Sequence, residues 1–227
     1  MPETKPIFVD DETAVLPHRI LKPENPGPHP TIVMIHGHLG NEDVMWIFRQ
    51  TLPKEWLVVA PRAILQDGEN SFSWHPRQQG KWPSLGMFDT AVDKLLQFID
   101  TLPETYDADP KQIYLMGFSQ GAATAFALAI REPERFQGIA SLVGFMPQRV
   151  EDAIDNARLA DLPVFMAVGT EDDRVPLEIA REAGKAVRAM GAFLAYREYD
   201  TGHKLNGDGM RKLKQWWVER AADAGQP

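Results

Sequence analysis

One serine of the chain stands where a serine can act as a nucleophile. Ser119 lies between two glycines in the run 117–121, which reads GFSQG. The apolar segment before it predicts a strand and the alanine-rich segment after it predicts a helix, so the serine falls on a sharp strand-to-helix turn. Such a turn lifts the hydroxyl above the sheet, and the glycines allow strand and helix to approach closely. The pattern predicts nucleophilic attack on an ester-like bond, although the same five letters also arise by chance in glycine-rich turns.

A serine hydroxyl needs a base that takes its proton, and the chain has six histidines. Proteins with this type of turn carry their catalytic groups in the chain order serine, acid, histidine. Only His203 follows both Ser119 and a candidate acid, and it lies between the last expected strand and the last expected helix. We therefore expect His203 to be the base.

The acid should lie on the loop that follows the next-to-last expected strand. Three acids stand there in a row, Glu171, Asp172 and Asp173. A solvated acidic turn accounts for any two of them, and the third would orient and support the His203 imidazolium. The residues themselves leave the assignment open between Asp172 and Asp173.

The tetrahedral intermediate of acyl transfer needs two backbone N–H donors. One is expected from Gln120, which directly follows the nucleophile, and the other from the loop after an early strand. That loop is 36–40 (HGHLG), where His38 is the expected donor through its backbone N–H. The His38 imidazole either points toward the cleft or is simply exposed on the loop.

The elements that must position these residues alternate along the chain. Apolar runs typical of buried strands occur at 31–36, 56–60, 112–116, 138–143, 163–168 and 193–199. Helical spacing of apolar residues occurs at 42–52, 84–102, 120–131, 177–190 and 209–222. Short strands buried on both faces and separated by helices predict a mostly parallel sheet covered by helices on both sides. We expect a single α/β domain over residues 1–227, without a large cap, because the stretch 144–162 is only about twenty residues long.

Aromatic residues gather in the long connection 67–83. We expect Phe72, Trp74 and Trp82, together with Leu39, to line a substrate pocket, because ligand sites are mostly apolar and aromatic. The same aromatics would also serve to pin a long loop to the body of the protein. Trp216 and Trp217 are neighbours on the last helix and are not expected to face the core together. One of them would then meet a partner subunit in a homodimer or cover the edge of the sheet.

The composition excludes several classes of function. Lys plus Arg is 24 and Asp plus Glu is 32, a formal net charge of −8, which disfavours nucleic-acid partners. There are no cysteines, and His36 and His38 lie two residues apart in a tight turn that would not bring them together on a metal, so we expect neither metal nor cofactor. We also expect a cytoplasmic protein without membrane insertion, because neither a signal-peptide pattern nor a long apolar stretch is present.

Several stretches resemble the motifs of one known family. They are 36–42 (HGHLGNE), 106–110 (YDADP), 113–122 (IYLMGFSQGA), 169–176 (GTEDDRVP) and the pair Gly202-His203. The chain resembles the phospholipase/carboxylesterase family of small α/β-hydrolases, which includes bacterial carboxylesterases and acyl-protein thioesterases, from about residue 31 to the last helix. The resemblance implies an α/β-hydrolase fold and selects Asp172 as the acid. The chain departs from the family pattern at Val168, where a histidine is usual, and at His38-Leu39, which bears on the shape of the acyl pocket.

The expected function is that of a serine carboxylesterase, or of a related thioesterase or lysophospholipase-like enzyme. It would cleave a small-molecule ester or thioester through an acyl-enzyme formed by Ser119, His203 and Asp172. Two alternatives stay open. The same chemistry would also serve a peptide, lactone or C–C bond, and a hydrolase fold can act as a non-catalytic ligand-binding receptor or scaffold.

Overall fold

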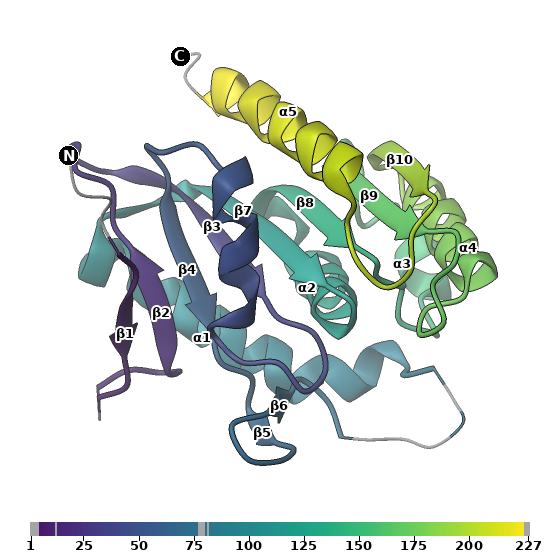
Figure 1. The fold of residues 1–227 in the computed structure, drawn as a ribbon, viewed down its shortest axis with the longest axis horizontal. Helices are drawn as coiled ribbons and strands as arrows, with labels where there is room; N and C mark the ends of the chain where they lie inside the picture. Colours follow the sequence, from purple (N-terminus) through teal and green to yellow (C-terminus); the bar gives the residue numbers. More distant parts are fainter. Residues whose placement is uncertain (1–4, 12, 77–79, 81, 225–227) are drawn as a thin grey trace.

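The structure is a computed structural model that describes residues 5–11, 13–76, 80 and 82–224. Its centre is an eight-stranded sheet with the order β1-β2-β4-β3-β7-β8-β9-β10 (Figure 1). The strands are β1 (Ile7–Val9), β2 (His18–Leu21), β3 (His29–Ile35), β4 (Leu57–Pro61), β7 (Ala108–Phe118), β8 (Phe136–Leu142), β9 (Pro163–Gly169) and β10 (Phe193–Tyr199). All pairings from β4 to β10 are parallel, whereas β1 and β2 join antiparallel at one edge. The predicted mostly parallel sheet is confirmed.

Helices and one small hairpin complete the chain. The helical segments are η1 (Val44–Thr51), η2 (Leu85–Phe88), α1 (Asp89–Tyr106), α2 (Gln120–Arg131), η3 (Pro133–Arg135), α3 (Glu151–Asp155), α4 (Leu177–Ala189) and α5 (Gly207–Ala224), where η marks a 3₁₀ helix. Strands β5 (Leu65–Gln66) and β6 (Phe72–Ser73) form a separate two-stranded hairpin. Only the short helix α3 lies in the stretch 144–162, which confirms the absence of a large cap.

Each face of the sheet carries its own apolar core, because successive side chains of a strand point to opposite faces. In β3, Val33 and Ile35 pack in the core shared with α1, α2 and α4. Ile32 and Met34, from the same strand, pack in the core shared with η1 and α5. Figure 1 shows α5 along one face of the sheet, with α1 and α2 behind it. The predicted covering of both faces by helices is therefore confirmed.

Two predicted helices differ from the structure. The segment expected as a helix at 42–52 is the 3₁₀ helix η1, in which residues three apart share a face, so Met45 and Phe48 are buried and Val44 and Ile47 are exposed. The helix expected to end at residue 102 continues as α1 through a proline in its last turn to Tyr106. The Tyr106 hydroxyl contacts a ring nitrogen of the buried His18 at 2.8 Å, which fixes this last turn to β2.

The expectation for the two tryptophans of the last helix was wrong. Both are buried, Trp217 completely and Trp216 almost completely. Their rings touch each other at a centroid distance of 4.5 Å, and Trp216 also packs on Phe165 of β9. Indole rings are long enough for neighbours about 100° apart on a helix to reach the same apolar surface when the helix lies flat on a sheet. Neither tryptophan is therefore available as an exposed contact for a partner subunit.

No helix in the described part of the chain is long and apolar enough to cross a membrane.

Candidate active site

Ser119 occupies a strained turn between β7 and α2. Its backbone torsions are φ 53° and ψ −116°, in a region that non-glycine residues rarely adopt. Its N–H donates to the Leu142 carbonyl of the neighbouring strand at 2.9 Å. A Cβ atom at Gly117 would lie 2.3 Å from the Gly121 oxygen, and one at Gly121 would lie 2.0 Å from the Ile35 oxygen. The two glycines of the motif are therefore required for the close approach of strand and helix.

His203 and Asp172 meet in a buried hydrogen bond. His203 Nδ1 lies 2.7 Å from Asp172 Oδ2, and the two side chains are 9% and 1% exposed. An ionised carboxylate only accepts hydrogen bonds, so Nδ1 carries a proton and Nε2 is the remaining ring nitrogen. The other Asp172 oxygen accepts the backbone N–H groups of Arg174 and Val175, both at 2.9 Å, which fixes the carboxylate. Asp173 lies exposed at the surface.

Strand order brings this pair to the same edge of the sheet as Ser119. The loops that carry Asp172 and His203 follow the parallel strands β9 and β10, and the carboxyl ends of parallel strands lie at one edge. The His203 ring packs edge-on against Phe118, the residue before Ser119, at a centroid distance of 5.2 Å. Within the described chain, no hydrogen bond joins the Ser119 hydroxyl to His203, and such contacts are often long before substrate binds.

The loop after β3 lies directly against the turn at Ser119. A Cβ atom at Gly37 would lie 3.3 Å from the Ser119 Cβ. The fully buried His36 shapes this loop, because its Nδ1–H donates to the Gly37 carbonyl at 2.7 Å and its Nε2 accepts the Ala63 N–H at 3.0 Å. Burial lowers the pKa of His36 to about 4, so the ring is neutral at pH 7. We did not predict this role; the signal for it was a histidine at the end of a buried strand.

The two expected backbone donors belong to Gln120, which follows Ser119 in the chain, and to His38, on the loop that packs against Ser119. Gln120 is the first residue of α2, where backbone N–H groups have no partner within the helix. His38 follows Gly37 on the loop, and its ring Nε2 lies 2.9 Å from Asp67 Oδ2. Leu39, next along the loop, is 46% exposed with φ 61°. The His38 ring is thus paired with a carboxylate that the sequence did not single out.

The aromatic residues of the connection 67–83 have different surroundings. Trp74 is fully buried; its indole N–H donates to the His36 carbonyl at 2.8 Å and its backbone N–H donates to Gln120 Oε1 at 2.9 Å. Trp74 therefore anchors the connection to the turn at Ser119. Phe72 is half-buried and lies 4.8 Å from the Arg62 guanidinium.

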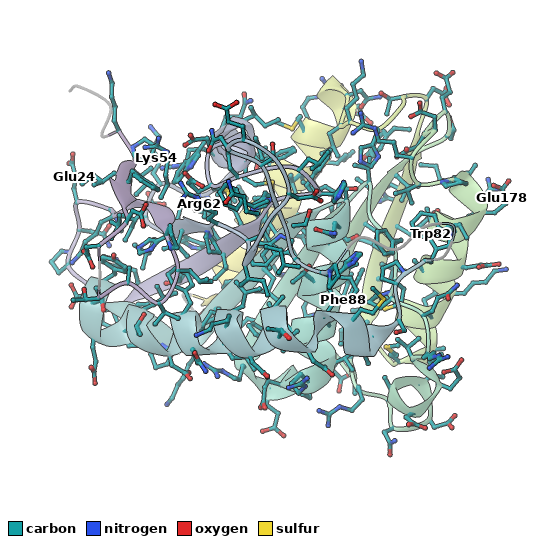
Figure 2. All side chains as sticks on the ribbon, turned by 90° about the horizontal axis from the view of Figure 1, so that it is seen from below. Glu24, Lys54, Arg62, Trp82, Phe88 and Glu178 are labelled. Atoms are coloured by element: carbon teal, nitrogen blue, oxygen red, sulfur yellow. The ribbon has the colours of Figure 1, made fainter. Side chains whose placement is uncertain are left out.

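Trp82 is half-buried and stands at the other end of this connection, on the side of α4 (Figure 2). It packs on Phe145 at a centroid distance of 4.7 Å. Together with Met146, Ile179 and Ala183 it lines a mostly apolar groove between α4 and the loop that follows β8. Residues 77–79 and 81 of the connection lie outside the described part of the chain.

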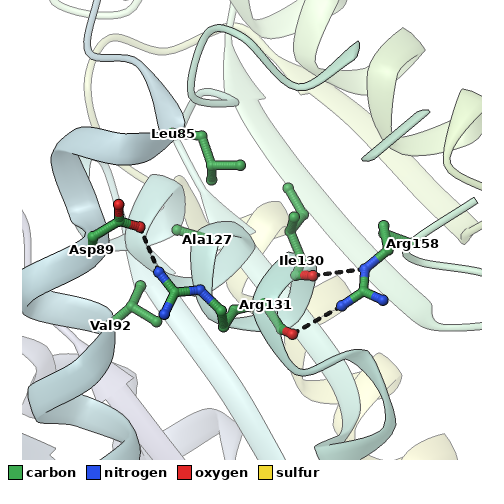
Figure 3. Close-up of a pocket in the computed structure, with 7 residues that line it drawn as sticks. All are labelled: Leu85, Asp89, Val92, Ala127, Ile130, Arg131 and Arg158. Carbon is green, nitrogen blue, oxygen red and sulfur yellow. Dashed lines mark hydrogen bonds and ion pairs between the residues drawn. The ribbon is translucent and has the colours of Figure 1, made fainter. Parts of the chain in front are cut away.

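A second crevice lies at the opposite end of α2 from Ser119 (Figure 3). Arg131 is ion-paired there with Asp89 at 2.5 Å and with Asp93 at 3.0 Å. Arg158 donates to the carbonyls of Ile130 and Arg131 at 2.9 and 2.8 Å, which satisfies the end of α2. These arginines have structural partners, so the site near Ser119 is the stronger candidate. Among the described residues, no group of three or more histidine, aspartate or glutamate side chains could hold a metal ion.

Comparison with known proteins identifies the family of the chain. The family described as Phospholipase/Carboxylesterase matches residues 17–218. The chain belongs to the phospholipase/carboxylesterase family. Among similar proteins, MhqD of Bacillus subtilis (strain 168) is 26% identical over 194 residues, which cover 83% of this chain and 92% of MhqD.

Solved structures of other proteins have the same fold as this chain. Carboxylesterases from Mesorhizobium loti and Bacillus cereus superpose with TM-scores of 0.81 and 0.79 at 16% and 22% sequence identity. The superpositions cover 94% and 92% of this chain, and 98% and 96% of the two carboxylesterases. The predicted family and α/β-hydrolase fold are both confirmed.

Proposed function

We propose that this protein is a serine hydrolase of carboxylic esters, with Ser119 as nucleophile, His203 as base and Asp172 as the residue that orients His203. One observation carries the proposal: Ser119 stands on a strained turn at the start of α2, at the same sheet edge as the buried His203–Asp172 pair. Membership of a family of phospholipases and carboxylesterases supports the ester bond as the target.

The reaction begins when His203 Nε2 takes the proton of the Ser119 hydroxyl. Ser119 Oγ attacks the ester carbonyl carbon, and the negative charge that forms on the carbonyl oxygen is stabilised by the backbone N–H groups of His38 and Gln120. The start of α2 adds the positive end of the helix dipole. The C–O bond of the ester then breaks, the alcohol leaves with the proton from His203, and Ser119 carries the acyl group.

Water completes the cycle. His203 takes a proton from the water as it attacks the acyl carbon, and the tetrahedral intermediate collapses to release the acid and restore the Ser119 hydroxyl. The two oxygens of Asp172 accept three hydrogen bonds, which fix the carboxylate beside His203. It holds the Nδ1–H form of His203 and stabilises the imidazolium that forms in each half of the cycle.

The substrate that fits these surroundings is a small-molecule ester or thioester. Only the five-residue helix α3 interrupts the stretch where other hydrolases insert a cap, which leaves the site open. Leu39 on the loop beside Ser119 and the groove at Trp82 supply apolar surface for an acyl chain or an alcohol.

Hydrolysis of p-nitrophenyl esters of increasing acyl length, beside thioesters of the same acyl chains, tests the proposal. We expect multiple turnovers by the wild-type protein and none above background by Ser119→Ala. A fluorophosphonate probe should label the wild type and not the variant. Full hydrolysis by Ser119→Ala would overturn the assignment of the nucleophile, and a wild-type protein that neither hydrolyses the panel nor takes the probe would favour a binding role.

A further inference from the structure

The β5–β6 hairpin and the residue after it, residues 65–74, hold the side chains of both expected backbone donors. At one end of this hairpin segment, Asp67 Oδ2 lies 2.9 Å from His38 Nε2. At the other end, the backbone N–H of Trp74 donates to Gln120 Oε1 at 2.9 Å. The two donors are far apart in the chain, one on the loop after β3 and the other at the start of α2, so this common support links them to one element.

Further contacts join the hairpin segment to the loop after β3. The Phe72 N–H donates to the Gly40 carbonyl at 2.9 Å, and Asn41 Nδ2 donates to the Asn70 carbonyl at 3.3 Å. Asp67 is itself fixed, because its Oδ2 also accepts the Ser73 hydroxyl at 3.0 Å and its N–H donates to the Ser71 carbonyl at 2.8 Å. The carboxylate that holds His38 therefore belongs to a hairpin with its own hydrogen bonds.

The peptide between Gly37 and His38 is held from both sides. Its carbonyl accepts the His36 Nδ1–H at 2.7 Å and the Gly40 N–H at 3.1 Å. In a trans peptide the N–H points away from the carbonyl, so these bonds direct the His38 N–H away from the interior of the loop. The His38 side of this peptide is fixed by the His38 ring, which is bound to Asp67. The loop needs this support because Leu39 has a positive φ of 61°, which is costly for a residue with a Cβ.

We propose that the hairpin segment sets the geometry of the oxyanion hole, and that Asp67 is a positioning residue that acts through His38. The inference rests on the proposed function, because it assigns a purpose to the two N–H donors. Asp67 does not touch the substrate in this account. Asp67 keeps the backbone N–H of His38 at the place where negative charge develops on the carbonyl oxygen. Its contribution is therefore larger in the transition state than in substrate binding.

The test compares five forms of the full-length protein with p-nitrophenyl butyrate: wild type, Asp67→Ala, Asp67→Asn, His38→Leu and the double variant His38→Leu/Asp67→Ala. Glu69→Gln is the matched control, because it removes one negative charge from an exposed position of the same hairpin. We expect Asp67→Ala to lower kcat about tenfold with KM within about twofold, since a displaced donor loses transition-state stabilisation. A boronic-acid transition-state analogue should lose affinity by a similar factor.

The remaining variants separate positioning from general damage. Asp67→Asn keeps an oxygen that accepts the Nε2–H of the His38 ring, so this variant should retain kcat within about threefold. His38→Leu keeps the backbone donor and loses the ring, so the double variant should be no slower than the slower single variant. An unchanged kcat in Asp67→Ala, a change in KM alone, or multiplying effects in the double variant would overturn the proposal. If Asp67→Ala does not fold, His38→Leu measures the same contact, and an unchanged kcat there is equally decisive.

Failure of this inference is distinguishable from failure of the proposed function. If Ser119→Ala is inactive and Asp67→Ala equals the wild type, the nucleophile stands and the role of the hairpin segment falls. If Ser119→Ala is fully active, both fall.

Discussion

Two histidine–aspartate pairs come from opposite sides of β7, the strand that leads to Ser119, in the order of the sheet: one from the loops after β9 and β10, and the other from the loop after β3 and the hairpin. Their hydrogen bonds are nearly equal, 2.7 Å for His203–Asp172 and 2.9 Å for His38–Asp67. Their burial is not: the side chains are 9% and 1% exposed in the first pair, and 33% and 29% exposed in the second. Water screens an exposed pair, which contributes little energy, whereas the interaction of a buried carboxylate with its histidine is screened much less. The first pair is therefore suited to support a charged imidazolium, and the second to hold a loop in place.

The largest expected difference between the pairs is in catalysis. His203→Ala should lower kcat by about a million-fold, because it removes the base that activates the nucleophile. His38→Leu should lower kcat only about tenfold, because its backbone N–H remains. Steady-state hydrolysis of p-nitrophenyl butyrate measures both, and circular dichroism checks that both variants are folded. Comparable losses in the two variants would break the distinction between the pairs.

The next largest effect concerns the acid of the buried pair. Asp172→Asn should lower kcat about 10⁴-fold, because an amide no longer favours the required form of His203. Asp173→Asn removes the same charge from the neighbouring exposed position and should leave kcat within about twofold. A larger loss in Asp173→Asn than in Asp172→Asn would move the acid to Asp173.

A third histidine near Ser119, His36, is buried with both ring nitrogens bonded to backbone groups, and it makes a different prediction. Burial lowers the pKa of His36 from 6.5 to about 4, so between these values the unfolded chain binds more protons than the folded one. Above pH 6.5 the ring is neutral in both states, and its titration does not lower the free energy of unfolding. As the pH falls from 6.5 toward 4, protons bind first to the unfolded chain, and the free energy of unfolding falls by about 3 kcal/mol. Urea unfolding at several pH values should show a steeper decline for the wild type than for His36→Gln. Parallel declines would contradict the neutral, buried state of His36.

The smallest expected effect is on the stability of the exposed pair. Asp67→Ala should change the free energy of unfolding by less than about 1 kcal/mol, since exposed ion pairs contribute little. Urea unfolding of wild type and variant at neutral pH measures this change. A loss of several kcal/mol would mean that Asp67 supports the fold as a whole rather than the oxyanion loop.

Much of the fold followed from the periodicity of the sequence. The helix expected at 120–131 is α2 with the same bounds, and the helix expected at 177–190 is α4, which ends at Ala189, just before the positive φ of 88° at Gly191. The short strands β5 and β6 left no such signal, because two residues cannot show an alternating pattern.

The two histidine–aspartate pairs show where prediction of the site from sequence ends. The partners are 31 residues apart in one pair and 29 in the other, so spacing does not separate them. The order of serine, acid and histidine along the chain predicted His203 as the base, but it left Asp172 and Asp173 equal. Asp67 was not identified at all, because a contact between two irregular loops depends on the path of the chain in space and leaves no local pattern.

The central claim is that Ser119 carries the acyl group during turnover, and it can be tested by trapping that intermediate. The protein is mixed with p-nitrophenyl acetate, quenched rapidly in acid and digested, and its peptides are weighed by mass spectrometry. We predict that the peptide containing Ser119 gains the mass of one acetyl group, and that the wild-type protein releases an initial burst of p-nitrophenol equal to the enzyme concentration. An acetyl group on another residue, or an initial burst with no acetyl group on the Ser119 peptide, would contradict the account.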